Sequence, residues 1–154
     1  MRLPPFQDLL DANREAVYRF LVAAVGHQDA DDCFQETFLA ALRAYPRLER
    51  ADNLRGWLLT IARNKALDHH RRQAQHPVLT DRLPEAAAPA ADPDHTEVWT
   101  VVRRLPAKQM SAVIYRFVND LPYRDIARLL DCSEEAARSN VHEALKKLRG
   151  ATYE

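Results

Sequence analysis

Residues 121–149, LPYRDIARLLDCSEEAARSNVHEALKKLR, carry the pattern that decides the fold of the C-terminal part of the chain. The pattern predicts a short helix over 123–130, a tight turn over 131–133 and a second helix over 134–149. A short helix, a turn of about three residues and a second helix form a helix-turn-helix, the geometry that places the second helix in the major groove of DNA. An ordinary antiparallel helix pair is the alternative interpretation.

The apolar residues of this stretch share one packing face: Ile126, Leu129, Val141, Leu145 and Leu148. Ala127 is small at the point where the two helices must cross closely. The polar side chains then face solvent on the second helix: Arg138, Ser139, Asn140 and His142. Arginine can read guanine and asparagine can read adenine, while Lys146 and Lys147 suit phosphate contacts.

Three acidic residues on the same predicted helix oppose DNA binding: Glu134, Glu135 and Glu143. The first two favour the positive end of the helix dipole, but all three repel phosphate. We therefore expect this helix to bind DNA weakly unless another contact holds it in place.

The rest of the chain is also predicted to be helical, because apolar residues recur three or four positions apart and no convincing period-two strand is found. Helices are expected over 6–24, with Gly26 as C-cap, from Asp29 to a stop at Pro46, and over 54–72. Further helices are expected over 98–104, and from Pro106 to about residue 119. Gly150 is expected to close the last helix.

Residues 73–97 differ in composition from both flanks, with four prolines, six alanines and five acidic residues against one basic residue. We interpret them as a semi-extended tether, with an ordered inhibitory segment as the alternative. The predicted fold class is therefore all-α, with two small helical domains joined by a flexible linker. The domains are a three-helix N-terminal domain (1–72) and a helix-turn-helix C-terminal domain (98–154).

The net charge is zero, with 22 basic and 22 acidic residues in 154, which disfavours autonomous tight DNA binding. The charges are nevertheless segregated. Residues 29–42 hold four acidic and no basic residues, whereas residues 55–72 hold five basic residues and one acidic residue. This pattern fits either solvated faces that balance each other, or an acidic helix that docks on a basic protein and a basic helix that meets phosphates.

Catalytic and metal-binding patterns are not found, so we expect no enzyme activity, no cofactor and no metal. The six histidines form no HExxH motif, the two cysteines form no CxxC motif, and no glycine-rich phosphate loop occurs. Two cysteines and the lack of a long apolar run fit the reducing cytoplasm and no membrane insertion. Cys33 is expected in the core, and a redox role for Cys132, in the predicted turn, is a minor alternative.

Three stretches resemble the extracytoplasmic-function (ECF) sigma factors of the bacterial sigma-70 family. DADDCFQETFL (29–39) resembles the segment that docks on the clamp helices of RNA polymerase. NLRGWLLTIARNKALDHHRR (53–72) resembles the segment that melts and reads the −10 promoter element. Residues 105–149 resemble the domain that reads the −35 element.

The resemblance implies three sets of binding residues. The polymerase-binding residues would be Asp32, Gln35, Glu36 and Leu39, which lie three or four apart and hence on one helix face. The −10 residues would be Arg47, Arg50, Asn53, Arg55, Arg63, Asn64, Lys65, Arg71 and Arg72, beside a loop that captures an extruded base. The −35 residues would be Arg138, Ser139, Asn140, His142, Lys146 and Lys147. Phe34, Phe38 and Trp57 are expected to pack in the core.

The resemblance implies a sigma factor that directs promoter-specific initiation, with core RNA polymerase, promoter DNA and an anti-sigma factor as partners. A tether would let two weak DNA-binding modules act together through effective concentration. A stand-alone helix-turn-helix regulator, which binds DNA without polymerase, is the alternative function.

Overall fold

The computed structural model describes residues 3–50, 52–75 and 93–152, with side chains in the last range described from 98 to 150. Throughout this described part, the regular secondary structure is helical, which confirms the all-α prediction. Most of the predicted tether lies outside the described residues. Its two ends are described, and both are helical.

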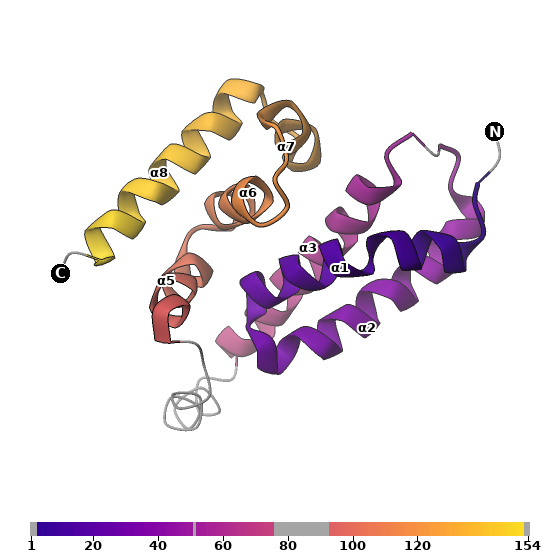
Figure 1. Cartoon of the computed structure of the whole chain (residues 1–154), viewed down its shortest axis with the longest axis horizontal. Coiled ribbons are helices and arrows are strands. Elements are labelled where there is room, and N and C mark those ends of the chain that lie inside the picture. Colours follow the sequence, from indigo (N-terminus) through magenta and orange to yellow (C-terminus); the bar gives the residue numbers. More distant parts are fainter. Residues whose placement is uncertain (1–2, 51, 76–92, 153–154) are drawn as a thin grey trace.

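The N-terminal domain consists of three long helices, shown from indigo to magenta in Figure 1. These are α1 (Phe6–Val25), α2 (His27–Ala44) and α3 (Leu54–Gln75), with a single 3-10 turn, η1 (Tyr45–Arg47), after α2. The three helices pack on one another, and α1 contacts both of the others along its length. The N-terminal domain thus has the three helices expected from the sequence.

Gly26 separates α1 from α2 with a single residue. Its φ of 89° lies in the left-handed region that glycine adopts without strain, and its carbonyl accepts the first hydrogen bond of α2 from the Ala30 amide, at 3.0 Å. Because this carbonyl already starts the next helix, α2 begins at His27, two residues before the predicted start at Asp29.

The core of the N-terminal domain joins aliphatic side chains of all three helices with a group of aromatic rings. Phe38 and Cys33 are buried, as predicted, while Phe34 and Trp57 are partly buried and pack against the core. The Tyr45 ring lies beside Trp57, with ring centroids 6.1 Å apart. Burial of Tyr45 beside Trp57 packs the chain that follows α2 against the start of α3.

The C-terminal domain contains the four helices predicted for it, in orange to yellow in Figure 1. They are α5 (Pro93–Arg104), α6 (Ala107–Phe117), α7 (Tyr123–Leu130) and α8 (Glu134–Thr152). The predicted tether is wrong at its two ends, because α3 continues to Gln75 and α5 begins at Pro93. Proline is tolerated in the first turn of a helix, where its missing N–H group has no partner to lose.

The turn of the helix-turn-helix follows the prediction. Asp131 adopts the left-handed conformation, with φ and ψ both 54°, and the Ser133 hydroxyl caps α8 by accepting a hydrogen bond from the Ala136 amide at 3.0 Å. The predicted end of α8 is wrong: the helix runs through Gly150 to Thr152. The space around Gly150 is open, so packing there neither stops nor extends the helix.

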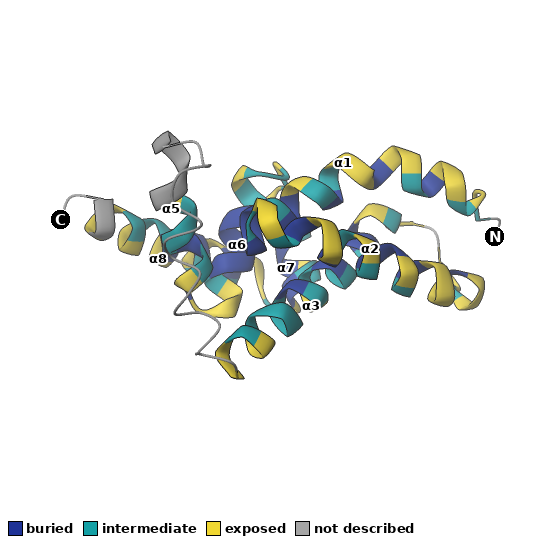
Figure 2. Ribbon diagram, turned by 90° about the horizontal axis from the view of Figure 1, so that it is seen from below, coloured by how far each residue is buried: buried dark blue, intermediate teal, exposed yellow. Residues whose placement is uncertain are grey.

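The two domains pack against each other, with α1 in contact with α5 and α6, and α3 in contact with α7. Figure 2 shows buried residues continuing across this junction, from α1 and α3 into α6 and α7. At its centre the Phe20 and Tyr115 rings are stacked, with centroids 5.2 Å apart. Both residues have no solvent-exposed surface, so the contact has an apolar centre.

Candidate polymerase and DNA interfaces

A groove with apolar walls lies between α1 and α2 at the end of the N-terminal domain that is remote from the C-terminal domain. It encloses about 380 Å³ and is lined by Phe6, Leu10, Phe34, Gln35, Phe38, Leu39 and Leu42. Leu39 and Leu42 are 51% and 50% exposed. Two half-exposed leucines beside one groove form a larger apolar surface than isolated exposed residues do.

The predicted acidic face borders this groove. Gln35 is exposed and lines the groove, while Asp32 is exposed and Glu36, partly exposed, lies toward Arg72 of α3. Figure 1 shows α2 on the outer side of the N-terminal domain, away from α7 and α8. Of the four residues of the predicted polymerase-binding set, all on α2, Gln35 and Leu39 line the groove.

Part of the acidic charge of α2 is met by α3. The His69 ring lies 3.2 Å from the Asp29 carboxylate, and the Arg72 guanidinium lies 3.9 Å from the Glu36 carboxylate. Both pairs are partly exposed, so solvent weakens them. These pairs fit the interpretation in which the two charged faces balance each other, while the docking interpretation stays a prediction.

The basic residues of α3 differ in what they contact. Arg55 donates to the Asn13 side-chain oxygen at 2.7 Å and to the Ala12 carbonyl at 3.0 Å, and Arg71 donates to Asp68 at 2.6 Å. Arg63 donates to the Ser111 hydroxyl of α6 at 2.7 Å. These arginines have structural partners, whereas Asn64 is exposed and Lys65 is partly exposed.

The loop before α3 presents two of the remaining predicted −10 residues. Arg47 and Arg50 are exposed on either side of Leu48. Asn53, also exposed, has a structural role: its side-chain oxygen accepts a hydrogen bond from the Gly56 amide at 3.1 Å and so caps α3. A Cβ at Gly56 would lie 2.9 Å from a methyl group of Leu129, which explains why glycine fits this crowded helix start.

The predicted recognition helix α8 presents its polar face to solvent. Arg138, Ser139, His142, Lys146 and Lys147 are exposed, and Asn140 is partly exposed. Arg138 bonds Glu134 at 3.1 Å and lies over the Tyr123 ring at 5.1 Å. Lys147 bonds Gln109 at 2.9 Å. The Glu134 and Tyr123 contacts hold the Arg138 guanidinium near the start of the helix, and the Lys147 bond joins α8 to α6.

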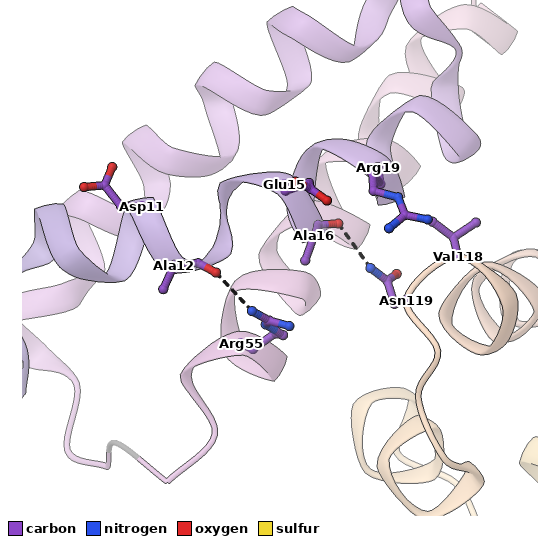
Figure 3. Close-up of a pocket in the computed structure, with 8 residues that line it drawn as sticks. All are labelled: Asp11, Ala12, Glu15, Ala16, Arg19, Arg55, Val118 and Asn119. Carbon is purple, nitrogen blue, oxygen red and sulfur yellow. Dashed lines mark hydrogen bonds between the residues drawn. The ribbon is translucent and has the colours of Figure 1, made fainter.

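A polar cleft marks the border between the two domains (Figure 3). It has a volume of about 350 Å³, with α1 on one side and Arg55, Val118 and Asn119 on the other. The Asn119 side chain donates to the Ala16 carbonyl across it, at 3.1 Å.

Sequence reasoning missed several residues with structural roles. Asn13, which interrupts the apolar stripe of the first helix, is only 6% exposed and donates to the Leu9 carbonyl at 2.9 Å. Arg103 donates to the carbonyls of Ala23 and Val22 in α1. For Asn13, a polar residue within an apolar stripe was a sequence signal of its structural role. No local pattern identifies Arg103.

Buried titratable groups accompany these contacts. Burial raises the pKa of the Cys33 thiol to about 11, and nearby carboxylates act in the same direction. Burial lowers the pKa of His70, whose Nε2 lies 2.7 Å from the Ala24 carbonyl oxygen. Within the described residues, no group of three or more His, Cys, Asp or Glu side chains could hold a metal ion. No helix in the same part combines the length and apolar character needed to cross a membrane.

Two family models match the chain: Sigma-70 region 2 over residues 9–76 and Sigma-70 region 4 over residues 95–148. The chain is 33% identical to the ECF RNA polymerase sigma factor SigC of Mycobacterium tuberculosis, over 88% of this chain and 76% of that protein. It is 30% identical to the RNA polymerase sigma factor CarQ of Myxococcus xanthus, over 94% and 87% of the two chains. The sigma factor RpoE of Bartonella quintana, solved in complex with the anti-sigma factor NepR, has the same fold, with 23% identity, a TM-score of 0.74 and 96% of each chain covered.

The chain therefore belongs to the sigma-70 family of RNA polymerase sigma factors. Within that family it is an ECF sigma factor, whose role is to direct transcription initiation at specific promoters. This is a class of transcription factors and not a class of enzymes. A stand-alone regulator is not favoured, because the match includes region 2 as well as the helix-turn-helix of region 4.

Proposed function

We propose that the groove between α1 and α2 is the surface that docks on the clamp helices of core RNA polymerase. Asp32, Gln35 and Glu36 would meet basic and polar groups of the clamp, and Leu39 would insert as the apolar anchor. The observation that supports this assignment is the joint exposure of Leu39 and Leu42 beside acidic side chains. Such an arrangement combines an apolar centre with a charged rim, as tight protein interfaces do.

We also propose a division of labour between the domains. Residues 1–72 would bind polymerase and the −10 element, residues 98–154 would bind the −35 element, and residues 73–97 would link them. In the first domain, Arg47 and Arg50 would flank the extruded DNA base. The exposed basic and amide groups of α3 would contact the sugar-phosphate backbone of the same DNA strand. In the second, α8 would enter the major groove.

The DNA contacts of α3 would require some arginines to exchange partners. Arg71 and Arg72 are exposed in their ion pairs, so phosphate oxygens can replace the carboxylates at small cost. Arg55 is held by two hydrogen bonds within its own domain, so we assign it to positioning α3, with Asn53, and not to direct DNA contact. On α8, Arg138 would leave Glu134 to reach a base edge.

Two further assignments, a protein partner and a location in the cell, rest on membership of the family. The structural relative RpoE was solved with an anti-sigma factor, and we propose that this chain also has an anti-sigma partner. We propose the cytoplasm as its location, since core polymerase acts there. Neither the anti-sigma partner nor the cytoplasmic location requires a cofactor.

The polymerase interface is tested by Leu39→Asp and by the charge reversal Asp32→Lys with Glu36→Lys, each in the full-length protein. Loss of one central apolar anchor is expected to weaken core polymerase binding by about tenfold or more, since central interface residues contribute more than about 1 kcal/mol. Glu15→Lys, an exposed site on α1 outside the groove, is the matched control. Binding is measured with labelled core polymerase, and initiation by run-off transcription. Unchanged binding by the α2 variants would refute the assignment.

A further inference from the structure

Tyr123, the first residue of α7, contacts an arginine from each of the two helices next to it in the chain. The guanidinium carbon of Arg116, on α6, lies 4.7 Å from the centre of the Tyr123 ring, and that of Arg138, on α8, lies 5.1 Å from it. Both distances are within the range of about 6 Å over which an aromatic ring attracts a cation. One ring therefore connects the helix-turn-helix with the helix that precedes it.

Arg116 holds the ring from the α6 side. Its Nη1 donates to the Leu121 carbonyl, in the turn before α7, at 3.1 Å. Pro122 follows with a φ of −69°, the value to which the proline ring restricts the chain, so few conformations are open at the entrance to α7. The Tyr123 ring thus has fixing contacts outside α8.

Arg138 has two partners, which differ in what they leave free for DNA. Its Nη2 donates to the Glu134 carboxylate at 3.1 Å, so this bond occupies a donor that DNA would use. The Tyr123 ring attracts the positive charge through its π-electrons and needs no N–H donor for that attraction. A guanidinium over the ring can therefore bond a base edge or a phosphate at the same time. The Tyr123 contact is compatible with DNA binding, whereas the Glu134 contact competes with it.

The position of the Arg138 side chain also affects the entropy of binding. Arg138 is exposed on α8, and a long exposed side chain loses conformational freedom when a ligand immobilises it, which lowers affinity. A ring that already restricts the guanidinium reduces this loss. Tyr123 can therefore increase DNA affinity without contacting DNA itself.

We propose that Tyr123 is a positioning residue for DNA recognition, which keeps the Arg138 guanidinium at the start of α8 in the place from which it contacts DNA. The inference rests on the proposed function, in which α8 enters the major groove of the −35 element. Because Tyr123 acts through Arg138, its substitution affects DNA binding only while the arginine is present.

A double-mutant cycle on the full-length protein, bound to core polymerase, tests this dependence. The probe is the fluorescein-labelled duplex that the parent holoenzyme selects most strongly from a pool of random-sequence DNA. Tyr123→Leu removes the ring and keeps an apolar side chain, and Arg138→Ala removes the guanidinium. Tyr123→Leu is expected to weaken binding by about two- to fivefold, the scale of an exposed cation–π contact. In the Arg138→Ala background the same substitution should have no effect.

Tyr123→Phe is the matched variant, because it keeps the ring and should therefore keep the affinity. Urea unfolding of each variant shows whether the fold is retained. A loss of affinity from Tyr123→Leu that is equal in both backgrounds would overturn the proposal, since Tyr123 would then act through the fold and not through Arg138. An equal loss in Tyr123→Phe would also overturn it, because the hydroxyl and not the ring would then be the contacting group.

Failure of the proposed function has a different signature. Lys146→Ala, at an exposed position further along α8, is expected to weaken binding by the loss of a phosphate contact. If neither Arg138→Ala nor Lys146→Ala changed the affinity, α8 would not be the DNA-reading helix, and the inference would fall with it. If both weakened binding and Tyr123→Leu did not, only the role of Tyr123 would be overturned. The polymerase interface is tested separately through Leu39.

Discussion

The two helices proposed to contact DNA, α3 and α8, use their polar side chains in different ways. On α3, Arg55 and Arg63 bond residues that lie 42 and 48 positions away in the sequence. On α8, Arg138 bonds Glu134, only four positions away, on the exposed face of the same helix. Arg55 and Arg63 of α3 therefore hold the tertiary structure together, whereas the Arg138–Glu134 pair of α8 is a local surface contact.

The contrast indicates which basic residues are available to a nucleic acid. An exposed local ion pair contributes little to stability and exchanges its partners readily. A long-range bond to a buried group can be broken only by rearranging the fold. We therefore expect substitutions around α3 to affect folding first, and substitutions on the surface of α8 to affect DNA binding first.

The largest effect is expected for Asn13→Ala. The substitution removes the oxygen that accepts from Arg55 Nε and the amide that bonds the Leu9 carbonyl. We expect the free energy of unfolding to fall by about 2 kcal/mol, the scale of a partly buried hydrogen bond to a charged group. Urea unfolding measures the loss. The exposed neighbour Arg14 is the control, and Arg14→Ala should change stability by a few tenths of a kcal/mol; equal losses in the two variants would contradict the anchoring role.

The second largest effect is expected in the pH dependence of stability, through His70, which also lies on α3. Its pKa is lowered in the folded protein, first by burial and then by the nearby His69 and Arg103. The unfolded chain therefore binds a proton more readily, so stability is complete at neutral pH and falls as the pH drops below the ordinary histidine pKa of 6.5. We expect His70→Gln to lose less stability than the parent protein between about pH 7 and 5.5.

This comparison is made by thermal unfolding across the pH range, with His27→Gln as the control because His27 is exposed at the start of α2. The control should keep the acid-dependent decline of the parent protein. If both variants lost stability in parallel with the parent, burial of His70 would not be the cause.

The smallest effect is expected for Glu134→Gln on α8. The pair with Arg138 is more than half exposed at the arginine, so its loss should cost no more than about 0.5 kcal/mol. The same change removes an acidic group and frees Arg138, so binding to promoter DNA by the polymerase complex should strengthen while stability hardly changes. Glu135→Gln, which removes the same charge from the neighbouring exposed position, sets the baseline. A stability loss as large as that of Asn13→Ala would contradict the proposed difference between the long-range bonds of α3 and the local pair of α8.

Much of the fold could be predicted because its signals are local. Gly26, Asp131 and Ser133 each fix a helix end through their own backbone preference or a hydrogen bond to a neighbour. The start of α5 at Pro93 was missed because alanine, acidic residues and proline suit both a tether and a helical first turn. Gly150 was expected to end α8, yet glycine lowers helix propensity without forbidding helix.

The candidate sites were predicted less completely, for a physical reason. The spacing of Asp32, Gln35, Glu36 and Leu39 places them on one helix face whatever the tertiary structure. In contrast, the partners of Arg103 and Asn119 lie about 80 and 103 positions away, so only the assembled fold shows them. Sequence locates a charged residue, but the structure determines whether it is available to a ligand.

The side-chain oxygen of Asn119 is buried, and it has no hydrogen-bond partner within the described part of the chain. An unpartnered buried oxygen costs about 1 to 3 kcal/mol, and this one belongs to the side chain that joins the two domains. This cost would disappear if the two domains separated, because water could then donate a hydrogen bond to the oxygen. One side chain thus supplies both a bond that favours contact between the domains and an oxygen whose burial opposes it.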